Sequence, residues 1–296
     1  MNKHFLLFCS FILLNAAWLF AQTPADSTII VNTQWTTTQV AKGVIHQEAN
    51  FKNLYGVPQN INIITIDTKV KGLRIGFADA TKKNVTTSEL AKDNQALAAL
   101  NGSYFNVKEG FSVCYFQMDK QLIDTTIHAE FARRVNGAII EKNGKIKLVP
   151  WDKTVEQKYM KHRPLSTKYK HVMASGPLML QGGKICDFTQ VSTKFVDTKH
   201  PRSAIAVSND KKIMFVTVDG RFPGKAEGIN IPELAHFLKI MGGKDALNLD
   251  GGGSTTLWHH AASENGVVNY PFDNQIYNHY GEREVANIVY VYTNKK

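Results

Sequence analysis

The chain has 296 residues, of which 43% are hydrophobic and 20% are charged, and its formal net charge is +10. This composition supplies enough apolar side chains for a large core and excludes an intrinsically disordered chain. The positive charge favours an anionic partner such as a phosphorylated glycan, but no basic run interleaved with aromatic residues points to nucleic acid.

The first 21 residues have the pattern of a secretory signal peptide. Lys3 precedes an almost wholly apolar run from Phe5 to Phe20, and Ala21 offers a small residue for cleavage. We therefore expect residues 1–21 to be removed and the protein to be exported to the periplasm or outside the cell. The alternative is an N-terminal membrane anchor. No later apolar run is long enough to span a bilayer, so no transmembrane segment is expected after cleavage.

Removal of the signal would leave Cys114 and Cys186 as the two cysteines of the mature chain. An oxidising compartment allows one disulfide between them. Cysteine is also a small residue that is often buried, and neither cysteine has the spacing of a metal ligand. Two free thiols are the favoured interpretation, and the disulfide remains the alternative.

Short β-type runs dominate the remaining sequence. We expect residues 22–59 to form an N-terminal arm and residues 60–296 to form one domain. In chain order, strands are predicted at Ile61–Asp67 and Leu73–Asp79, hairpins at Gly137–Trp151 and Ser203–Gly220, and a last strand at Val285–Thr293.

Two helices carry clear start signals. Thr86 and Glu89 form a capping box, and Asn230 can cap a helix that ends at Gly242. Many hairpins with few helices predict an α+β fold, in which a mixed, mostly antiparallel β-sheet core carries a few packed helices.

The segment ALNLDGGGSTTLW, residues 246–258, is the most unusual part of the sequence. It is not a phosphate-binding P-loop, because the Gly-Lys-Ser/Thr ending is missing, and its consecutive glycines do not fit a dinucleotide fingerprint. The amides of Gly251, Gly252 and Gly253, with the hydroxyl of Ser254, can form an anion-binding nest beside the carboxylate of Asp250. The alternative is a tight glycine bulge in which the aspartate caps a turn.

Four other segments put polar groups at predicted strand ends, where loops carry functional side chains in register. They are NGSYF (residues 101–105), SGPLML (residues 175–180), PRSAIAV (residues 201–207) and VTVDGR (residues 216–221). Each segment taken singly is also compatible with an ordinary turn.

In this order, these segments and the glycine segment resemble the phosphodiester glycosidase family, from about Asn60 to the C-terminus. The resemblance implies an exported hydrolase that cleaves a sugar-1-phosphodiester, of the N-acetylglucosamine-1-phosphodiester type, in surface or extracellular glycans. It carries functional roles over to the following positions: Asn101, Gly102, Tyr104, Phe105, Ser175, Gly176, Arg202, Asp219, Arg221, Asp250, Gly251, Gly252, Gly253 and Ser254.

The chemistry of these residue types suggests their roles. Asp219 and Asp250 are the candidate catalytic acids, which act at an oxocarbenium-like anomeric carbon or on water there. Arg202 and Arg221 are the candidate phosphate clamps, because a guanidinium group can bind two phosphate oxygens at once. Asn101, Tyr104 and Phe105 would contact the sugar. The long segment of residues 270–284 is expected to cover the sheet edge and contribute to a glycan pocket.

Structural roles remain open for several of these residues. Asp219 could cap its turn, Arg202 could be a buried partner of a carboxylate, and Asn101 could satisfy loop amides. An extended backbone points Tyr104 and Phe105 in opposite directions, so one of the two rings is expected in the core.

Other functions also remain open. No cofactor is expected, although Asp79, Asp219 and Asp250 could instead share a calcium ion. The competing functions are a phosphodiesterase that cleaves the P–O bond and a non-catalytic module that binds glycans or envelope polysaccharide.

Overall fold

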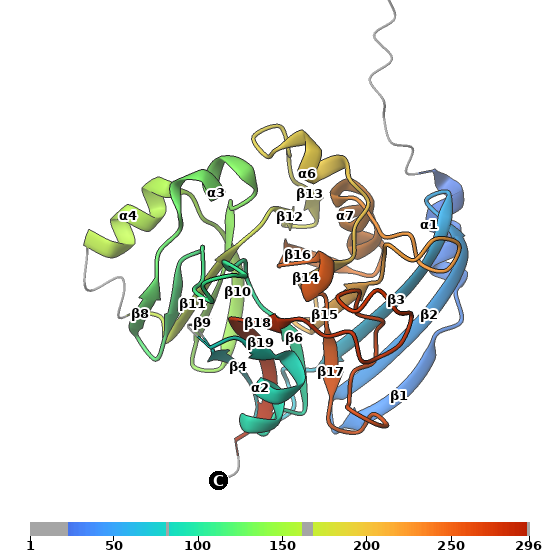
Figure 1. Ribbon diagram of the computed structural model, residues 1–296, viewed down its shortest axis with the longest axis horizontal. Coiled ribbons are helices and arrows are strands. Elements are labelled where there is room, and N and C mark those ends of the chain that lie inside the picture. Colours follow the sequence, from blue (N-terminus) through green and yellow to red (C-terminus); the bar gives the residue numbers. More distant parts are fainter. Residues whose placement is uncertain (1–22, 81–82, 162–167, 295–296) are drawn as a thin grey trace, which may run out of the picture.

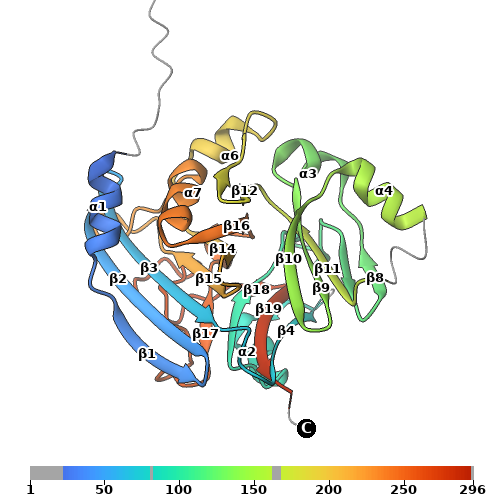
Figure 2. The same ribbon diagram turned by 180° about the vertical axis from the view of Figure 1, so that it is seen from behind.

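A computed structural model describes residues 23–80, 83–161 and 168–294. Among these residues, three antiparallel sheets and a two-stranded ribbon surround a shared interior, and the helices lie on the outside (Figure 1). The view from behind shows the long strands near the N-terminus on one side and the sheet that contains β9 (Gly137–Lys142) and β11 (His171–Ser175) on the other (Figure 2). The predicted α+β fold with a mostly antiparallel core is confirmed.

The largest sheet has eight strands and combines the beginning, the middle and the later part of the chain. In spatial order its strands are β1 (Thr36–Ala41), β2 (Val44–Leu54), β3 (Val57–Ile66), β15 (Ile213–Val218), β14 (Arg202–Ser208), β16 (Gly243–Asn248), β12 (Leu178–Gln181) and β13 (Lys184–Ile185).

The other sheets are smaller. A five-stranded sheet contains β10 (Lys145–Pro150), β9 (Gly137–Lys142), β11 (His171–Ser175), β7 (Phe116–Met118) and β8 (Gln121–Asp124). A four-stranded sheet contains β17 (Leu257–His259), β6 (Ala98–Asn101), β19 (Asn287–Thr293) and β4 (Leu73–Asp79). The ribbon pairs β18 (Glu284–Val285) with β5 (Val85–Thr86).

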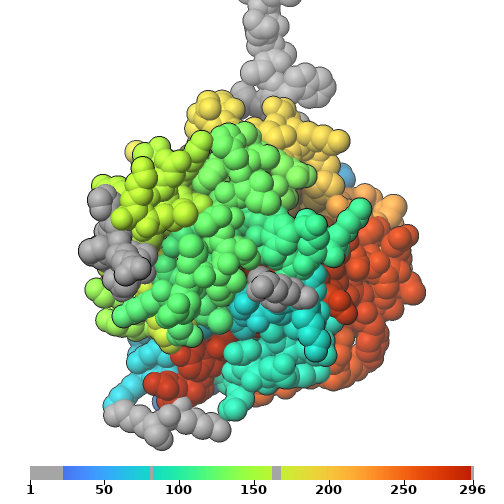
Figure 3. Space-filling view, turned by 60° about the vertical axis from the view of Figure 1, so that its left-hand side comes forward, coloured from blue at the N-terminus to red at the C-terminus, as the bar shows by residue number. Residues whose placement is uncertain are grey.

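Helices cover the outer faces of these sheets. They are α1 (Pro24–Asn32), α2 (Thr87–Asp93), α3 (His128–Arg133), α4 (Lys153–Lys161), α6 (Thr193–Asp197) and α7 (Ile231–Ile240). The capping box predicted at Thr86 and Glu89 forms, and Asn230 caps α7 as predicted, in a capping box with Glu233. The green residues of the five-stranded sheet and its helices make up much of the face seen in Figure 3.

Apolar side chains from all three sheets meet in one core. Ile64, Phe77, Phe116, Ile139 and Phe215 belong to the same cluster, and each is at most 3% exposed. A second cluster fills the space between the eight-stranded sheet and α7. The large sheet is therefore buried on both faces, which holds the ends of its central strands in fixed positions.

The segment predicted as an N-terminal arm belongs both to the eight-stranded sheet and to the layer of helices outside it. Strand β3 pairs with β15 over residues 61–66 of β3, and β2 pairs with β3. Helix α1 lies against α7, where the Ser27 hydroxyl is 3.1 Å from Nε2 of His236 and the Tyr55 amide donates to Asp26 at 2.9 Å. The predicted signal peptide, including Lys3, lies outside the described residues.

Two further expectations concern the cysteines and the membrane. Cys114 is buried, Cys186 is partly buried, and both are free thiols, as the sequence favoured. Among the residues that the structure describes, no helix has the length and apolar character that crossing a membrane requires.

Candidate active site

Three of the predicted functional residues lie at neighbouring strand ends of the eight-stranded sheet. Arg202 is the first residue of β14, Asp219 follows the last residue of β15, and Asp250 comes two residues after β16. Strand β14 runs antiparallel to both neighbours and places Arg202 opposite Val218. The start of β14 therefore lies beside the ends of β15 and β16, so that residues distant in the sequence come to one edge.

The triple glycine makes a sharp turn at this edge. Gly252 has a φ of +64°, a conformation that favours glycine. Its amide donates to the carbonyl of Pro201 at 2.8 Å, and the amide of Gly251 donates to the Asp250 carboxylate at 3.0 Å. Two of the three amides that the sequence predicts as an anion nest are thus engaged within the protein.

The absence of side chains in this turn lets two guanidinium groups come against the backbone. A β-carbon on Gly252 would lie 3.1 Å from Nη2 of Arg221. A β-carbon on Gly253 would overlap the guanidinium of Arg283 and lie 2.6 Å from Oδ1 of Asp273, its ion-pair partner. The glycines therefore accommodate cationic side chains at the positions where the sequence predicts a bound anion.

Asp250 is partly exposed and lies among cations and donors. Burial raises the pKa of its carboxyl above the ordinary value, and Arg134, the Ser254 hydroxyl, Arg283 and the Gly251 amide reduce this rise without cancelling it. These neighbours therefore make the ionised form, which can act as a nucleophile or base, more accessible than burial alone would allow.

Arg134 is a site residue that the sequence reasoning missed. It directly follows helix α3, and its Nε lies 2.6 Å from Oε2 of Glu130. Its guanidinium carbon lies 3.5 Å from the centroid of the Tyr104 ring. Because it follows a short helix rather than a strand, no strand-end pattern marks it.

Arg221 is exposed and held in a strained backbone conformation. Its φ is +66°, which is uncommon for a residue with a side chain and occurs often at functional sites. Its Nη2 lies 3.4 Å from Nδ1 of His200, and its guanidinium carbon lies 5.4 Å from the ring centroid of Phe272. Burial, Arg202 and Arg221 together lower the pKa of His200 to about 4, so the imidazole is neutral at pH 7.

Arg202 occupies a different environment from Arg221. It is 2% exposed, its Nε donates to the carbonyl of Ile229 at 3.2 Å, and one Nη donates to the carbonyls of Phe195 and Thr198, both at 2.9 Å. Burial is the main reason that its pKa falls to about 10. Through these contacts the Arg202 guanidinium connects α6 and the backbone at Ile229 to the start of β14.

Residues 94–292, which include every site residue described above, match the family model for phosphodiester glycosidases. The match spans well over half of the chain. The chain belongs to the phosphodiester glycosidase family.

Individual members of the family show how far the likeness extends. The chain is 25% identical over 188 residues to the mouse N-acetylglucosamine-1-phosphodiester alpha-N-acetylglucosaminidase, covering 60% of this chain and 34% of the relative. The human enzyme of the same name is 25% identical over 186 residues and is covered to 35%. The aligned region thus spans about a third of the length of these relatives.

Solved structures share the fold. The catalytic domain of the zebrafish enzyme of that name, auto-inhibited by its pro-peptide, superposes with a TM-score of 0.64 at 19% identity, covering 89% of this chain and 85% of that domain. A hypothetical protein from Synechocystis gives a TM-score of 0.65 at 17% identity, covering 88% of this chain and 64% of that chain.

The first phosphodiester glycosidase motif, NGSYF, lies in the interior of the protein. Asn101 is fully buried, its Nδ2 donates to the carbonyl of Asp250 at 2.7 Å, and its Oδ1 accepts from Ser203 at 2.6 Å. Gly102 packs against the Asn287 backbone and has no room for a β-carbon. Asn101 therefore fixes the backbone of Asp250 directly, two residues after the end of β16.

The two aromatic residues of this motif are also buried, Tyr104 at 1% exposure and Phe105 at 8%. The Tyr104 hydroxyl donates to the carbonyl of Gly176 at 2.5 Å. The hydroxyl of Ser175 is buried as well and has no hydrogen-bond partner among the described residues. The sequence predicts that these residues contact the sugar and that one of the two rings lies in the core. Both rings lie in the core instead, and neither is exposed to a sugar in this structure.

Asp219 is 1% exposed and contacts the segment that covers the sheet edge. Its carboxylate accepts from Nδ2 of Asn269 at 2.9 Å and from the amide of Tyr270 at 3.1 Å. Burial raises the pKa of Asp219 to about 7 against these two hydrogen bonds, and Glu48 adds to the rise. Asp219 and Asp250 thus have different neighbours, and Asp219 anchors the start of the covering segment.

This covering segment, residues 270–283, brings aromatic rings to the site. The rings of Tyr270 and Tyr277 stack with centroids 3.9 Å apart, and Phe222 packs edge-on against Tyr277 and Phe272.

Within the described part of the chain, no group of three or more His, Cys, Asp or Glu side chains is arranged to hold a metal ion.

Proposed function

We propose that this protein is an exported hydrolase that cleaves a sugar-1-phosphodiester, of the N-acetylglucosamine-1-phosphodiester type, between the anomeric carbon and the oxygen. Membership of the phosphodiester glycosidase family supports the reaction class. The names of the mammalian relatives support the sugar and the linkage. The signal-like N-terminus supports export, and the positive net charge suits a surface or extracellular glycan that carries phosphate.

The single observation that carries the proposal is the surroundings of Asp250. The positive charges of two guanidinium groups, Arg134 and Arg283, act to lower the pKa of its carboxyl. A third guanidinium group, that of Arg221, lies against Gly252 in the adjacent turn. A carboxylate next to several cations can meet the developing positive charge of an anomeric carbon while the cations bind the departing phosphate.

In the proposed reaction the bond between the anomeric carbon and the phosphate oxygen breaks, and its electron pair stays on the phosphate. Asp250 either bonds to the anomeric carbon and is later displaced by water, or removes a proton from water that attacks directly. Phosphate diester anions are weakly basic, so the leaving group needs cations more than a proton. Arg221 and Arg283 fill that role, and neutral His200 can donate a further hydrogen bond.

The remaining candidates receive supporting roles in this proposal. Asp219 holds the covering segment in place, and Asn101 and Arg202 fix the strand ends on either side of Asp250. Phe272 lies beside Arg221, Tyr277 packs against Phe222, and both rings are partly exposed. They offer apolar faces to the sugar in place of Tyr104 and Phe105.

Hydrolysis of UDP-N-acetylglucosamine in oxygen-18 water tests the reaction. Label in the released sugar supports cleavage at the anomeric carbon, whereas label in the phosphate product identifies a P–O-cleaving phosphodiesterase. Asp250→Asn is expected to lower kcat by at least about 1000-fold, since it removes the reacting carboxylate. Asp93→Asn, at an exposed position at the end of α2, is the matched control and should keep full activity.

Other results would overturn the proposal. Full activity of Asp250→Asn would exclude the site. Absence of turnover of any sugar phosphodiester by a wild-type protein that binds glycans would identify a binding module.

A further inference from the structure

The same strands that carry Arg202, Asp219 and Asp250 at one end carry a basic surface at the other. Strand β14 ends at Ser208, β15 begins at Ile213 and β9 ends at Lys142, all at the edge away from the candidate active site. The six residue steps of β14 separate the two edges by ~20 Å. The basic surface is therefore a distinct region of the molecule.

This surface is a groove of about 1050 Å³ lined by seven lysines. Lys142, Lys145 and Lys147 come from the hairpin of β9 and β10, and Lys69, Lys168, Lys211 and Lys244 come from segments around it. All seven are exposed, and none forms a salt bridge with any residue that the structure describes. Among the described residues of the lining, Asp245 is the one carboxylate, and it accepts a hydrogen bond from the Gly182 amide at 2.8 Å.

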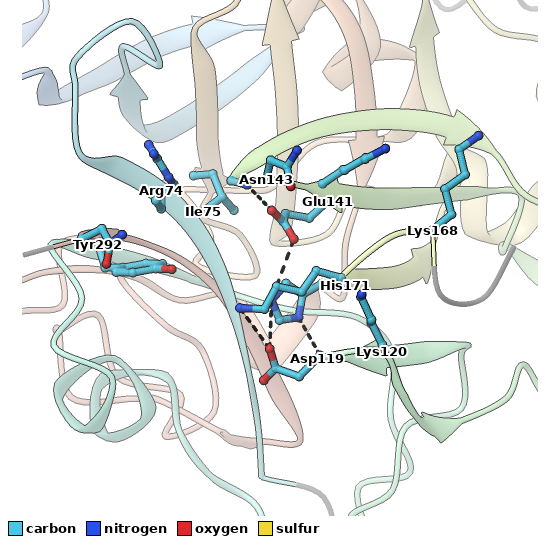
Figure 4. A pocket seen from close by; sticks show the side chains of 13 residues that line it. Arg74, Ile75, Asp119, Lys120, Glu141, Asn143, Lys168, His171 and Tyr292 are labelled. Carbon is cyan, nitrogen blue, oxygen red and sulfur yellow. Dashed lines mark hydrogen bonds and ion pairs between the residues drawn. The ribbon is translucent and has the colours of Figure 1, made fainter. Parts of the chain in front are cut away.

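A second pocket, of about 560 Å³, adjoins this groove and shares Lys142, Asn143 and Lys168 with it. Figure 4 shows its side chains, with Arg74, Lys120, Lys168 and Tyr292 around Glu141, Asp119 and His171. Lys170, which also lines the pocket, pairs with Asp119 at 3.0 Å.

Glu141 is the unusual member of the second pocket. It is 2% exposed, and its Oε1 accepts from the Gly144 amide in the hairpin turn. Its Oε2 has no hydrogen-bond partner among the described residues, and Nε2 of His171 lies 3.9 Å away from it. A buried carboxylate oxygen without a donor is costly, which suggests that a ligand supplies one.

The side chains of the two pockets together are complementary to a ligand that carries two kinds of chemical group. The lysines and Arg74 favour repeated negative charges along an extended molecule, and Glu141 favours a hydroxyl that donates a hydrogen bond. We propose that these two adjoining pockets bind an acidic polysaccharide chain, with its anionic groups on the lysines and a sugar hydroxyl on Glu141. The site lies apart from the proposed active site and would hold the protein on a polymer regardless of the bond it cleaves.

Other polyanions fit less well. The aromatic residues in the two linings are Tyr169 and Tyr292, whereas proteins that bind single-stranded nucleic acid use several aromatic rings to stack bases. The unpaired Glu141 carboxylate also could not bind the phosphate groups of a nucleic acid backbone or of an anionic lipid surface, because both groups are negatively charged acceptors. Nucleic acid and membrane are therefore alternative outcomes of the test.

Binding of a polygalacturonate oligomer of ten sugars, measured by calorimetry on the full mature chain, tests the inference. The double variant Lys145→Glu/Lys147→Glu should weaken binding at least tenfold. Lys153→Glu/Lys158→Glu, which makes the same charge change at exposed positions of α4, should alter it less than twofold. Turnover of a small soluble sugar phosphodiester should be the same in both double variants, so that loss of docking is distinguished from loss of the active site.

Glu141→Gln separates recognition of a saccharide from general attraction to a polyanion. The substitution keeps the acceptor for Gly144 and makes the pocket more positive, so a simple polycationic surface would bind more tightly. Recognition of a hydroxyl by Oε2 predicts weaker binding, by about tenfold. Tighter binding of Glu141→Gln, equal binding of an uncharged dextrin, or stronger binding of an oligothymidylate or of phosphatidylglycerol vesicles would each overturn the proposal.

Discussion

The guanidinium carbon of Arg134 lies 3.5 Å from the centroid of the Tyr104 ring, and this contact connects the interior of the fold to Asp250. Tyr104 is fixed in turn by its hydroxyl, which donates to the Gly176 carbonyl and accepts from Nδ2 of Asn248 at 2.8 Å. A cation stacked on a buried ring has few alternative positions. The Tyr104 motif thus contributes to the site by holding a cation near Asp250.

Arg134→Gln should therefore alter the titration of Asp250. Burial raises the pKa of the Asp250 carboxyl and Arg134 limits that rise, so removal of Arg134 raises the pKa further. If the ionised carboxylate is the active form, the acid limb of the kcat/KM profile against pH moves to higher pH. The pH profile of UDP-N-acetylglucosamine hydrolysis measures this shift.

Arg133→Gln is the matched control for this substitution. The Arg133 side chain is 58% exposed and contacts the same Glu130 at 3.6 Å, without a contact to Tyr104. Its pH profile should coincide with that of the wild type. An unshifted acid limb in Arg134→Gln would remove Arg134 from the site.

Several strand ends of the fold, including two at this site, could be anticipated from the sequence, because short-range patterns indicate them. The hairpin turn at Asn143 and Gly144 forms, with β9 and β10 on either side. Asp219 and Asp250 follow β15 and β16 as expected. Each of these features depends on neighbouring residues, which a single sequence contains.

The approach of distant side chains could not be anticipated in the same way. Arg134 follows a short helix and Arg283 lies in an irregular segment, so neither has a periodic pattern around it. Arg202 stands at a strand end as predicted, yet its guanidinium turns inward to three carbonyls. The direction of a long side chain depends on tertiary packing, which residue spacing does not encode.

Substitutions of Arg221 should separate function from stability. Arg221→Lys keeps the charge but loses bidentate binding, so KM for the phosphodiester should rise by about tenfold. Arg221→Gly also removes the guanidinium, but glycine adopts the φ of +66° without strain. Its Tm should stay within about 2 °C of the wild type while activity falls. A drop in Tm that parallels the loss of activity would instead assign Arg221 a structural role.

Gly253→Ala should disturb the site through the space it fills. The added β-carbon would overlap the Arg283 guanidinium and press on Asp273, so the ion pair must move away from the turn. We expect kcat/KM to fall at least tenfold, since the displaced cation no longer faces Asp250.

Gly182→Ala provides the comparison for this substitution. Gly182 has a φ of +59° and no atom within 4 Å of a β-carbon, so alanine there costs stability through backbone strain, by about 1 kcal/mol, and leaves activity unchanged. Equal activity losses in the two variants, at matched fractions of folded protein, would mean that the Gly253 effect is only a loss of folding.

The raised pKa of Asp219 predicts a specific dependence of stability on pH. Burial raises that pKa to about 7, whereas an aspartate in the unfolded chain titrates near ~3.9. Between these values the folded protein binds more protons than the unfolded chain, so this residue's contribution to the free energy of unfolding decreases as pH rises from about 4 to about 7. Asp219→Asn removes the titration and should flatten that part of the curve.

The slope with pH is more informative than the absolute stability of this variant. An asparagine side chain cannot accept from both Asn269 and Tyr270 through two oxygens, so Asp219→Asn carries a constant loss at every pH. Urea unfolding at pH 4.5, 5.5, 6.5 and 7.5 should show the difference between variant and wild type shifting in favour of the variant as pH rises. Asp93→Asn should track the wild type throughout. Parallel curves for Asp219→Asn would mean that the carboxyl ionises normally in the fold, and the 270–283 segment would then be anchored by a charged group.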